Sequence, residues 1–167
     1  LPDCLLRGRE MFEWDRLKAE CLGQDPASRV RRGIGVACFS YGSNTYPVGV
    51  EIAGARMLLN QDGTVNLQIG ATEIGQGSDT VFAQMAAQTL GIPFEQIRVI
   101  STQDTDITAY DPGSFASRQS YVAAPAIHQA ALQLRARILS LAAQLCHQDV
   151  GSLTLSDGYV VLAGAPD

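Results

Sequence analysis

The chain has 167 residues, of which 46% are hydrophobic and 17% charged, and its net charge is −5. This length and composition are typical of one globular domain with a core and exclude a disordered chain. The acidic balance argues against nucleic acid as a partner. No apolar run approaches the roughly 20 residues of a membrane-spanning helix. We therefore expect a single domain over residues 1–167, located in the cytoplasm and not in a membrane.

The first half of the chain predicts a helix, a buried strand and a β-hairpin. Apolar residues recur at steps of three and four over residues 9–22, which is the helical period. Residues 33–42 are apolar on both alternating faces and predict a buried strand. Alternation over residues 48–59 and 64–70, on either side of an Asp-Gly turn, predicts an antiparallel hairpin.

The second half predicts two helices and three short strands. Residues 78–90 have the helical period, residues 97–101 predict a strand, and a long helix follows the loop at 103–114. Pro125 lies in the first turn of that helix or kinks it, and periodicity does not decide between the two. An Asp-Gly turn within residues 152–162 predicts a second hairpin. Helices mixed with antiparallel strands define an α+β fold rather than a doubly wound sheet.

The stretch GATEIGQGSDT, residues 70–80, joins a predicted strand to a predicted helix and is a candidate anion site. A helix N-terminus carries unpaired N–H groups and the positive end of the helix dipole, and glycines let a ligand approach the backbone. The alternative is a tight connection capped by Ser78 or Asp79. Gln76, flanked by two glycines, favours a ligand slightly, because its amide is free to donate and accept. The glycine spacing matches neither the dinucleotide fingerprint nor the P-loop.

A similar pattern precedes the long helix. The stretch DPGSFASRQSY places Pro-Gly, small residues and hydroxyls there, with Ser114, Ser117, Gln119 and Ser120 around the helix start. A simple N-cap is again the alternative. We hypothesise that the two helix starts converge on one elongated anionic ligand.

Other polar residues give weaker signals. Asp104, Asp106 and Asp111 lack the pattern of a twelve-residue calcium loop and are expected to be solvated loop acids. His128 and His147 have no Cys or Ser partner in a known catalytic arrangement and are expected to be structural. The four cysteines have neither a zinc nor an iron–sulfur spacing. We therefore predict no metal ligand among the side chains of this chain.

Two segments resemble the large subunit of the molybdenum hydroxylases, the family of xanthine dehydrogenase and aldehyde oxidase. TVNLQIGATEIGQGSDTVFAQMAAQTLGIP is similar to the family's strand, its E-x-G-Q-G-x-x-T turn and its helix ending in LGIP. GSFASRQSY resembles the family's second cofactor segment, in which an Ala-Ser-Arg-like run opens a helix. The resemblance covers residues 9–145 and implies an α+β part of a molybdopterin-binding domain.

The resemblance also implies which residues contact the cofactor. Gln76 matches the glutamine beside the metal centre, and Ala116 matches a backbone position that faces molybdenum. Ser117, Gln119 and Ser120 match the helix start that binds the pterin and phosphate portion. The implied contacts are Gly75, Gln76, Gly77, Thr80, Ala116, Ser117, Gln119 and Ser120. The implied cofactor is molybdopterin with Mo, with or without a cytosine nucleotide.

The family hydroxylates purines, other N-heterocycles or aldehydes with a glutamate base, and electrons leave through iron–sulfur clusters to flavin (FAD). That glutamate lies near the end of the family's large subunit, in a segment absent here, and Glu73 belongs to the turn. No catalytic residue is therefore expected in this chain. Since it begins with Leu1, we expect an inactive piece of a xanthine dehydrogenase-like oxidoreductase of purine metabolism.

The resemblance implies partners outside these residues. They are the remainder of the large subunit, iron–sulfur and flavin subunits or domains, and a small purine or aldehyde substrate. One alternative function is a stand-alone nucleotide- or anion-binding module without catalysis. A purely structural domain is another.

Overall fold

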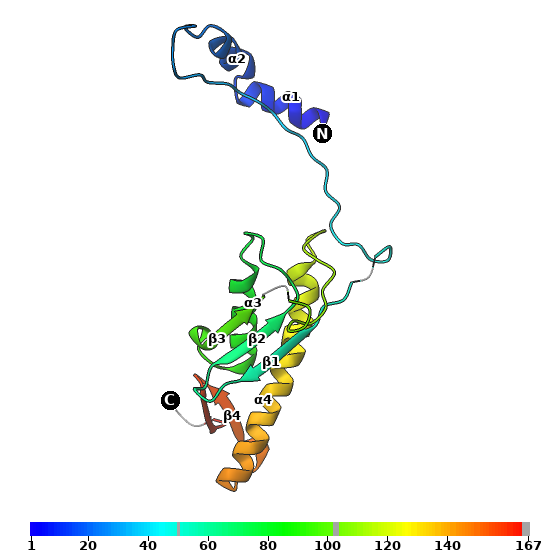
Figure 1. The fold of residues 1–167 in the computed structure, drawn as a ribbon, viewed down its shortest axis with the longest axis vertical. Helices are drawn as coiled ribbons and strands as arrows, with labels where there is room; N and C mark the ends of the chain where they lie inside the picture. The colour runs from blue at the N-terminus through cyan, green and yellow to red at the C-terminus, as the bar shows by residue number, and fades with distance from the viewer. Residues whose placement is uncertain (50, 102–103, 165–167) are drawn as a thin grey trace. The chain divides into compact units, whose positions relative to one another are not determined.

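The computed structural model describes residues 1–49, 51–101 and 104–164, and they divide into two units, Leu1–Ser40 and Tyr41–Asp167 (Figure 1). The first unit contains two helices, and the second contains the sheets and the remaining helices. The single domain expected over residues 1–167 stays a prediction.

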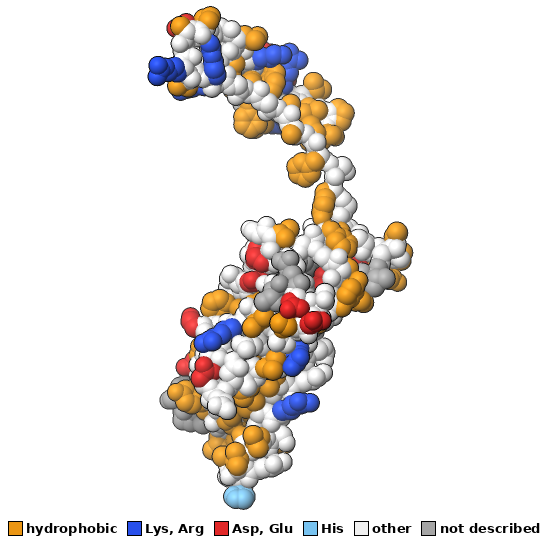
Figure 2. All heavy atoms as spheres, viewed as in Figure 1, with side chains coloured by type: hydrophobic (Ala, Val, Ile, Leu, Met, Phe, Trp, Pro, Cys, Tyr) orange, Lys and Arg blue, Asp and Glu red, His pale blue; other side chains and the backbone are white. Residues whose placement is uncertain are grey.

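The first unit begins with α1 (Pro2–Met11) and α2 (Trp14–Leu22). The single helix predicted over residues 9–22 is therefore wrong, because the backbone of Glu13 has a left-handed φ of 48° that ends one helix before the next begins. Neither helix buries a side chain within its unit. Figure 2 shows hydrophobic, Lys and Arg side chains side by side on the surface of this unit.

The strand predicted over residues 33–42 is not formed. These residues form neither a helix nor a strand, and their apolar side chains are exposed, Phe39 to 87%. An isolated strand has no neighbour to accept and donate its ladder hydrogen bonds, so apolar alternation alone does not produce one. The predicted burial of residues 33–42 is therefore wrong.

The second unit is built around a three-stranded sheet in the order β1-β2-β3 (Figure 1). The hairpin of β1 (Ala55–Leu59) and β2 (Val65–Ile69) is antiparallel, as predicted. Its first strand starts seven residues later than predicted, because a turn bonded from the Gly49 amide to the Thr45 carbonyl (2.7 Å) occupies the expected start. Val50 lies outside the described residues.

The third strand, β3 (Ile97–Ile100), pairs parallel to β2, with Val65 opposite Ile97. Helix α3 (Ser78–Leu90) and the short 3-10 helix η1 (Phe94–Gln96) make the crossover between the two strands. The prediction that all strands pair antiparallel is therefore wrong for β2 and β3. The predicted α+β class is confirmed. A parallel neighbour cannot be read from hydrophobic alternation, since alternation is the same in both directions.

The core forms on one face of the sheet. β2 alternates between buried and half-buried residues, and its buried side chains Val65, Leu67 and Ile69 pack in one cluster with Phe82 of α3 and Ile127 of the long helix. The strand period of two and the helical period of 3.6 place these apolar residues on facing surfaces. The core therefore fixes where α3 and the long helix begin, which is where the candidate site lies.

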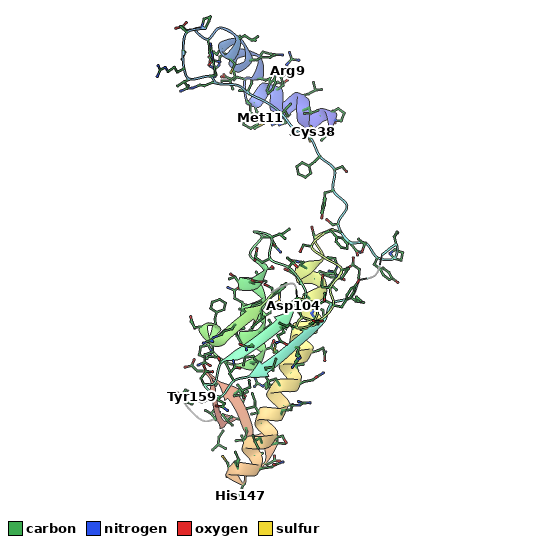
Figure 3. All side chains as sticks on the ribbon, in the orientation of Figure 1. Arg9, Met11, Cys38, Asp104, His147 and Tyr159 are labelled. Atoms are coloured by element: carbon green, nitrogen blue, oxygen red, sulfur yellow. The ribbon has the colours of Figure 1, made fainter. Side chains whose placement is uncertain are left out.

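The long helix is α4 (Ala124–Cys146), and a π-helical turn, η2 (Gln119–Ala123), precedes it. Pro125 lies in the first turn of α4, which settles the alternative left open by periodicity. After the 3-10 helix η3 (Val150–Ser152), β4 (Leu153–Ser156) and β5 (Tyr159–Leu162) form the predicted second hairpin. Figure 3 shows Tyr159 on β5 and His147 at the far end of α4. None of the helices in the described ranges is long and apolar enough to cross a membrane.

Candidate functional site

Glu73 caps the glycine-rich turn before α3. One carboxylate oxygen accepts the amides of Gly75 (2.7 Å) and Gly77 (3.0 Å), and the other accepts the amide of Asp79 (3.2 Å). These bonds, with Gly77 the strongest contributor, hold the pKa of Glu73 below its ordinary value of 4.5. The predicted cap by Ser78 or Asp79 is therefore wrong, and the anion at this helix start is supplied by the protein itself.

The side-chain amide of Gln76 is engaged, which corrects the prediction that it is free. Its oxygen accepts the amide of Ile74 (2.7 Å), and its nitrogen donates to the carbonyl of Thr72 (3.1 Å) and to the side-chain oxygen of Gln119. The nitrogen of Gln119 donates to the same carbonyl (2.8 Å) and to the hydroxyl of Ser114. Two segments 43 residues apart are thus joined by neutral amide side chains.

The backbone of the second segment is left-handed at two successive residues. Ala116 has φ 50° and Ser117 has φ 55°, and such angles are rare and strained for residues with a Cβ. The amide of Ala116 donates to the hydroxyl of Tyr41, and its carbonyl accepts the amide of Asn44 (2.8 Å). A segment far away in sequence therefore holds both the backbone amide and the backbone carbonyl of Ala116.

Arg118, which the sequence interpretation did not assign to the site, is buried to 2% exposure directly after this pair. Its guanidinium forms ion pairs with Glu51 (2.8 Å) and Asp111 (2.6 Å). The prediction that Asp111 is a solvated loop acid is therefore wrong, while Asp104 and Asp106 are exposed as predicted. The available signal was that Arg118 is the one charged residue in the run GSFASRQS, because an Arg that is buried requires acidic partners.

Hydrogen bonding to Thr45, followed by that to Arg118, holds the pKa of Glu51 below its ordinary value. The hydroxyl and the amide of Thr45 both donate to this carboxylate, the amide at 3.0 Å. Glu51 is therefore kept ionised opposite the guanidinium.

The start of η2 differs from the start of α3. No acceptor among the described residues receives the backbone amides of Gln119, Ser120 and Tyr121, and the exposed side chains of Ser117 and Ser120 have no hydrogen-bond partner there. Unpaired amides at the start of a long helix favour an anion. One of the two predicted helix starts is thus available to a ligand, and the other is filled by Glu73.

A shallow hollow of about 340 Å³ lies where the two segments meet. Its lining residues are Tyr41, Ile74, Gln76, Ser114, Phe115, Ser117, Arg118, Gln119 and Ser120. Gly75 and Gly77 flank Gln76, and a Cβ on either would meet no atom within 4 Å. Thr80 is exposed in the first turn of α3 and Ala116 is buried, and neither lines the hollow.

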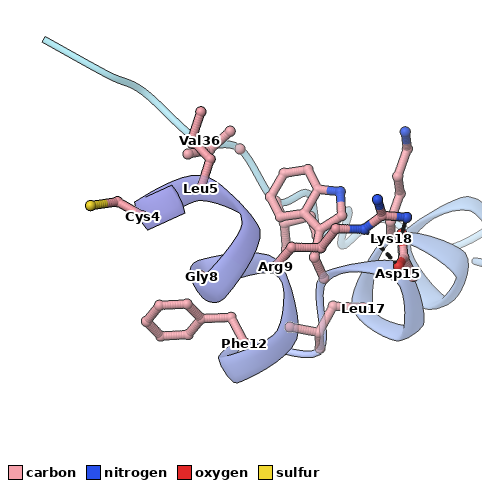
Figure 4. Close-up of a pocket in the computed structure, with 12 residues that line it drawn as sticks. Cys4, Leu5, Gly8, Arg9, Phe12, Asp15, Leu17, Lys18 and Val36 are labelled. Carbon is pink, nitrogen blue, oxygen red and sulfur yellow. Dashed lines mark hydrogen bonds and ion pairs between the residues drawn. The ribbon is translucent and has the colours of Figure 1, made fainter. Parts of the chain in front are cut away.

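A second hollow, of about 830 Å³, lies within the first unit (Figure 4). Apolar side chains such as Leu5 and Phe12 line it beside the exposed ion pair of Arg9 and Asp15 (2.9 Å). Across residues 1–49, 51–101 and 104–164, no three His, Cys, Asp or Glu side chains gather as a metal site. The candidate site residues described above all lie in the second unit.

Comparison with known proteins matches residues 7–167 to the model of the molybdopterin cofactor-binding domain. The putative xanthine dehydrogenase molybdenum-binding subunit XdhA of Escherichia coli K12 is 62% identical over 167 residues, which are all of this chain and 22% of that subunit. Among solved structures, quinoline 2-oxidoreductase from Pseudomonas putida 86 is 30% identical with a TM-score of 0.60, over 67% of this chain and 14% of that one.

The reconstituted CO dehydrogenase from Oligotropha carboxidovorans is 26% identical with a TM-score of 0.64, over 99% of this chain and 22% of that one. The chain thus spans about a fifth of the length of the Escherichia coli subunit. These matches support a cofactor domain over a stand-alone anion-binding module. The chain belongs to the family of molybdopterin cofactor-binding domains.

Proposed function

We propose that this chain is part of the large subunit of a xanthine dehydrogenase-like molybdenum hydroxylase and that its second unit binds one side of molybdopterin. The observation that carries the proposal is the meeting of two segments through Gln76 and Gln119, beside the open helix start of η2. Backbone amides at a helix start suit an anionic group, and the second segment presents them at η2. The first segment contributes the open backbone at Gly75 and Gly77 instead.

The donor set suits a flat heterocycle that carries a phosphate. The unpaired amides of Gln119, Ser120 and Tyr121 suit phosphate oxygens, and the exposed hydroxyls of Ser117 and Ser120 add donors. The open space at Gly75 and Gly77 lets a planar ring approach the backbone. When bound, the group supplies the molybdenum centre at which hydroxylation takes place. The proposed contacts are Gly75, Gln76, Gly77, Thr80, Ala116, Ser117, Gln119 and Ser120, with no catalytic side chain in this chain.

The remaining parts of the proposal concern the whole protein. Its substrate is a purine, with other N-heterocycles or aldehydes as the next class, and the identity to the Escherichia coli molybdenum-binding subunit supports this order. Electrons pass to iron–sulfur clusters and FAD in other subunits or domains, and the protein works in the cytoplasm. The cofactor is plain molybdopterin or its cytosine dinucleotide.

The test uses the full-length protein that contains these residues. It is purified from a host that makes molybdopterin and assayed for bound molybdenum, for released pterin and for oxidation of hypoxanthine and benzaldehyde. We expect molybdenum and pterin in equimolar amounts and oxidation of the purine. Protein without molybdenum and pterin, from cells that load a control molybdenum hydroxylase, would overturn the proposal. Released nucleotide separates the two cofactor forms.

A further inference from the structure

We propose that Arg118 is a positioning residue of the cofactor-binding region, which holds the left-handed backbone of Ala116 and Ser117 through ion pairs with Glu51 and Asp111. The inference rests on the proposed function, because these backbone positions are among the proposed cofactor contacts. Arg118 acts through its neighbours and not by touching the reacting atoms.

The guanidinium of Arg118 is held on every side. Nε donates to Glu51 (2.8 Å), and Nη1 donates to Asp111 (2.6 Å) and to the carbonyl of Gly113 (3.0 Å). Nη2 donates to the carbonyl of Ile52, and the ring of Phe115 lies 5.6 Å from Cζ. A planar fork with several fixed donors suits this arrangement, whereas a Lys ammonium cannot reproduce it.

The bonds of Arg118 close the turn that contains the strained pair. Its backbone amide donates to the carbonyl of Phe115 (3.1 Å), which brackets Ala116 and Ser117. Its partner Glu51 also binds the amide of Thr45 (3.0 Å). The same 41–45 segment bonds to the backbone of Ala116 through Tyr41 and Asn44. Through Glu51, Arg118 therefore also stabilises the segment that holds this turn.

The charges explain why removal of Arg118 is a poor test. Glu51 and Asp111 are 12% and 1% exposed, and the second carboxylate oxygen of Asp111 has no hydrogen-bond partner among the described residues. A neutral residue at position 118 would leave the buried Asp111 and the half-buried Glu51 without their cation, and the protein would fold poorly. Arg118→Lys keeps the charge and removes the fork, which makes it the informative variant.

The experiment compares Arg118→Lys with wild type and with Arg137→Lys in the full-length protein. Arg137 is an exposed arginine on α4 and serves as the matched control. We expect Arg118→Lys to retain about five- to thirtyfold less molybdenum and pterin. The reason is that the turn at Ala116 and Ser117 loses contacts that favour its cofactor-binding conformation. Arg137→Lys should retain both in full. The Mo(V) electron paramagnetic resonance signal of the remaining loaded protein should shift in Arg118→Lys alone.

A second variant separates positioning from simple stabilisation. Ala116→Gly removes the cost of a left-handed angle, so adding it to Arg118→Lys should restore part of the cofactor content if Arg118 acts through this backbone. Arg118→Lys with wild-type cofactor content and an unshifted spectrum would overturn the inference while the proposed function stands. A loss that follows the melting temperature and that Ala116→Gly does not relieve would also overturn it. A wild-type protein without cofactor would instead refute the proposed function.

Discussion

At position 73 the turn carries a charged side chain, and at position 76 it carries a neutral one. Glu73 satisfies the amides of the α3 start, so an anionic ligand gains nothing there and would meet a like charge. Gln76 donates and accepts without a charge and reaches the second segment through Gln119. Glu73 therefore keeps the turn in shape, while Gln76 stays a proposed cofactor contact.

The capping role of Glu73 predicts a pH-dependent stability. Because its pKa is lowered in the folded state, the stabilisation is complete above the ordinary value of 4.5 and is lost as the pH falls through the folded value. Glu73→Gln should therefore lower the melting temperature of the chain at neutral pH and approach wild type in acid. Melting curves between about pH 3 and 8 measure this difference.

The exposed Glu95, which forms no side-chain hydrogen bond among the described residues, is the matched control for Glu73→Gln. Glu95→Gln should melt with the wild type at neutral pH. A deficit of Glu73→Gln that stays constant down to acid pH would show that the carboxylate charge is not what stabilises the turn.

Gln76→Ala should separate activity from folding in the full-length protein. The side chain is exposed, so the free energy of unfolding should change by less than about 1 kcal/mol. Turnover should fall by up to about a hundredfold, because Gln119 loses the donor that fixes its amide beside the proposed cofactor. Steady-state kinetics and urea unfolding measure the two effects. Gln84→Ala, an exposed glutamine on α3, is the control, and wild-type turnover in Gln76→Ala would remove Gln76 from the site.

At the scale of elements, the hairpin of β1 and β2 supports the loop that carries Asp111. A Cβ on Gly54 would lie 2.6 Å from the Cβ of Ala109, and a Cβ on Gly70 would lie 2.0 Å from the carbonyl oxygen of Ala109. Gly54 precedes β1 and Gly70 follows β2 at the open end of the hairpin, and only glycine at both positions lets this loop cross so closely. The glycine at position 70, which the sequence interpretation grouped with a ligand turn, is thus required for packing.

Gly70→Ala should consequently displace the loop and loosen the ion pair of Asp111 with Arg118. We expect a loss of about 1–3 kcal/mol in the free energy of unfolding, as for other overpacked sites. Gly42→Ala is the control, because a Cβ there meets no atom within 4 Å. Urea unfolding of the chain compares the two variants. Equal stability of both would mean that the loop adapts to the added methyl group without cost.

At the scale of the whole molecule, the two units differ in how they are stabilised. The second unit has a core of strand and helix side chains. The helices of the first unit are ten and nine residues long and bury no side chain within that unit. Helices of this length are marginal in water without packing. Local ion pairs at exposed positions, such as Arg9 with Asp15, add little.

The chain expressed alone should therefore fold in its second unit but show no hydroxylase activity. It spans 22% of the Escherichia coli subunit, and no catalytic side chain is proposed within it. Circular dichroism should report the folded unit, and assays with hypoxanthine and benzaldehyde should show no turnover. The full-length protein at the same concentration is the control. Oxidation of either substrate by the isolated chain would contradict the assignment of catalysis to other segments.

The sequence by itself determined the local structure of the second unit and the identity of the two candidate segments. Period two in β2, the helical period in α3 and the Asp-Gly turns depend on neighbouring residues, so they can be read without a fold. The glycine-glutamine turn and the run before η2 were recognisable for the same reason. Gln76 and Gln119 could be named from their motifs.

Only the tertiary structure decided which groups pair across long separations. Arg118 pairs with Glu51 across 67 positions, and Gln76 bonds to Gln119 across 43. The parallel partner of β2 is likewise a strand that follows only after a helix. No local period records such contacts, because they form when the core packs the elements together. The failed strand at residues 33–42 shows the converse, since a pattern without a partner forms no ladder. The structure also showed that one helix start is filled by Glu73 and that the other presents its amides.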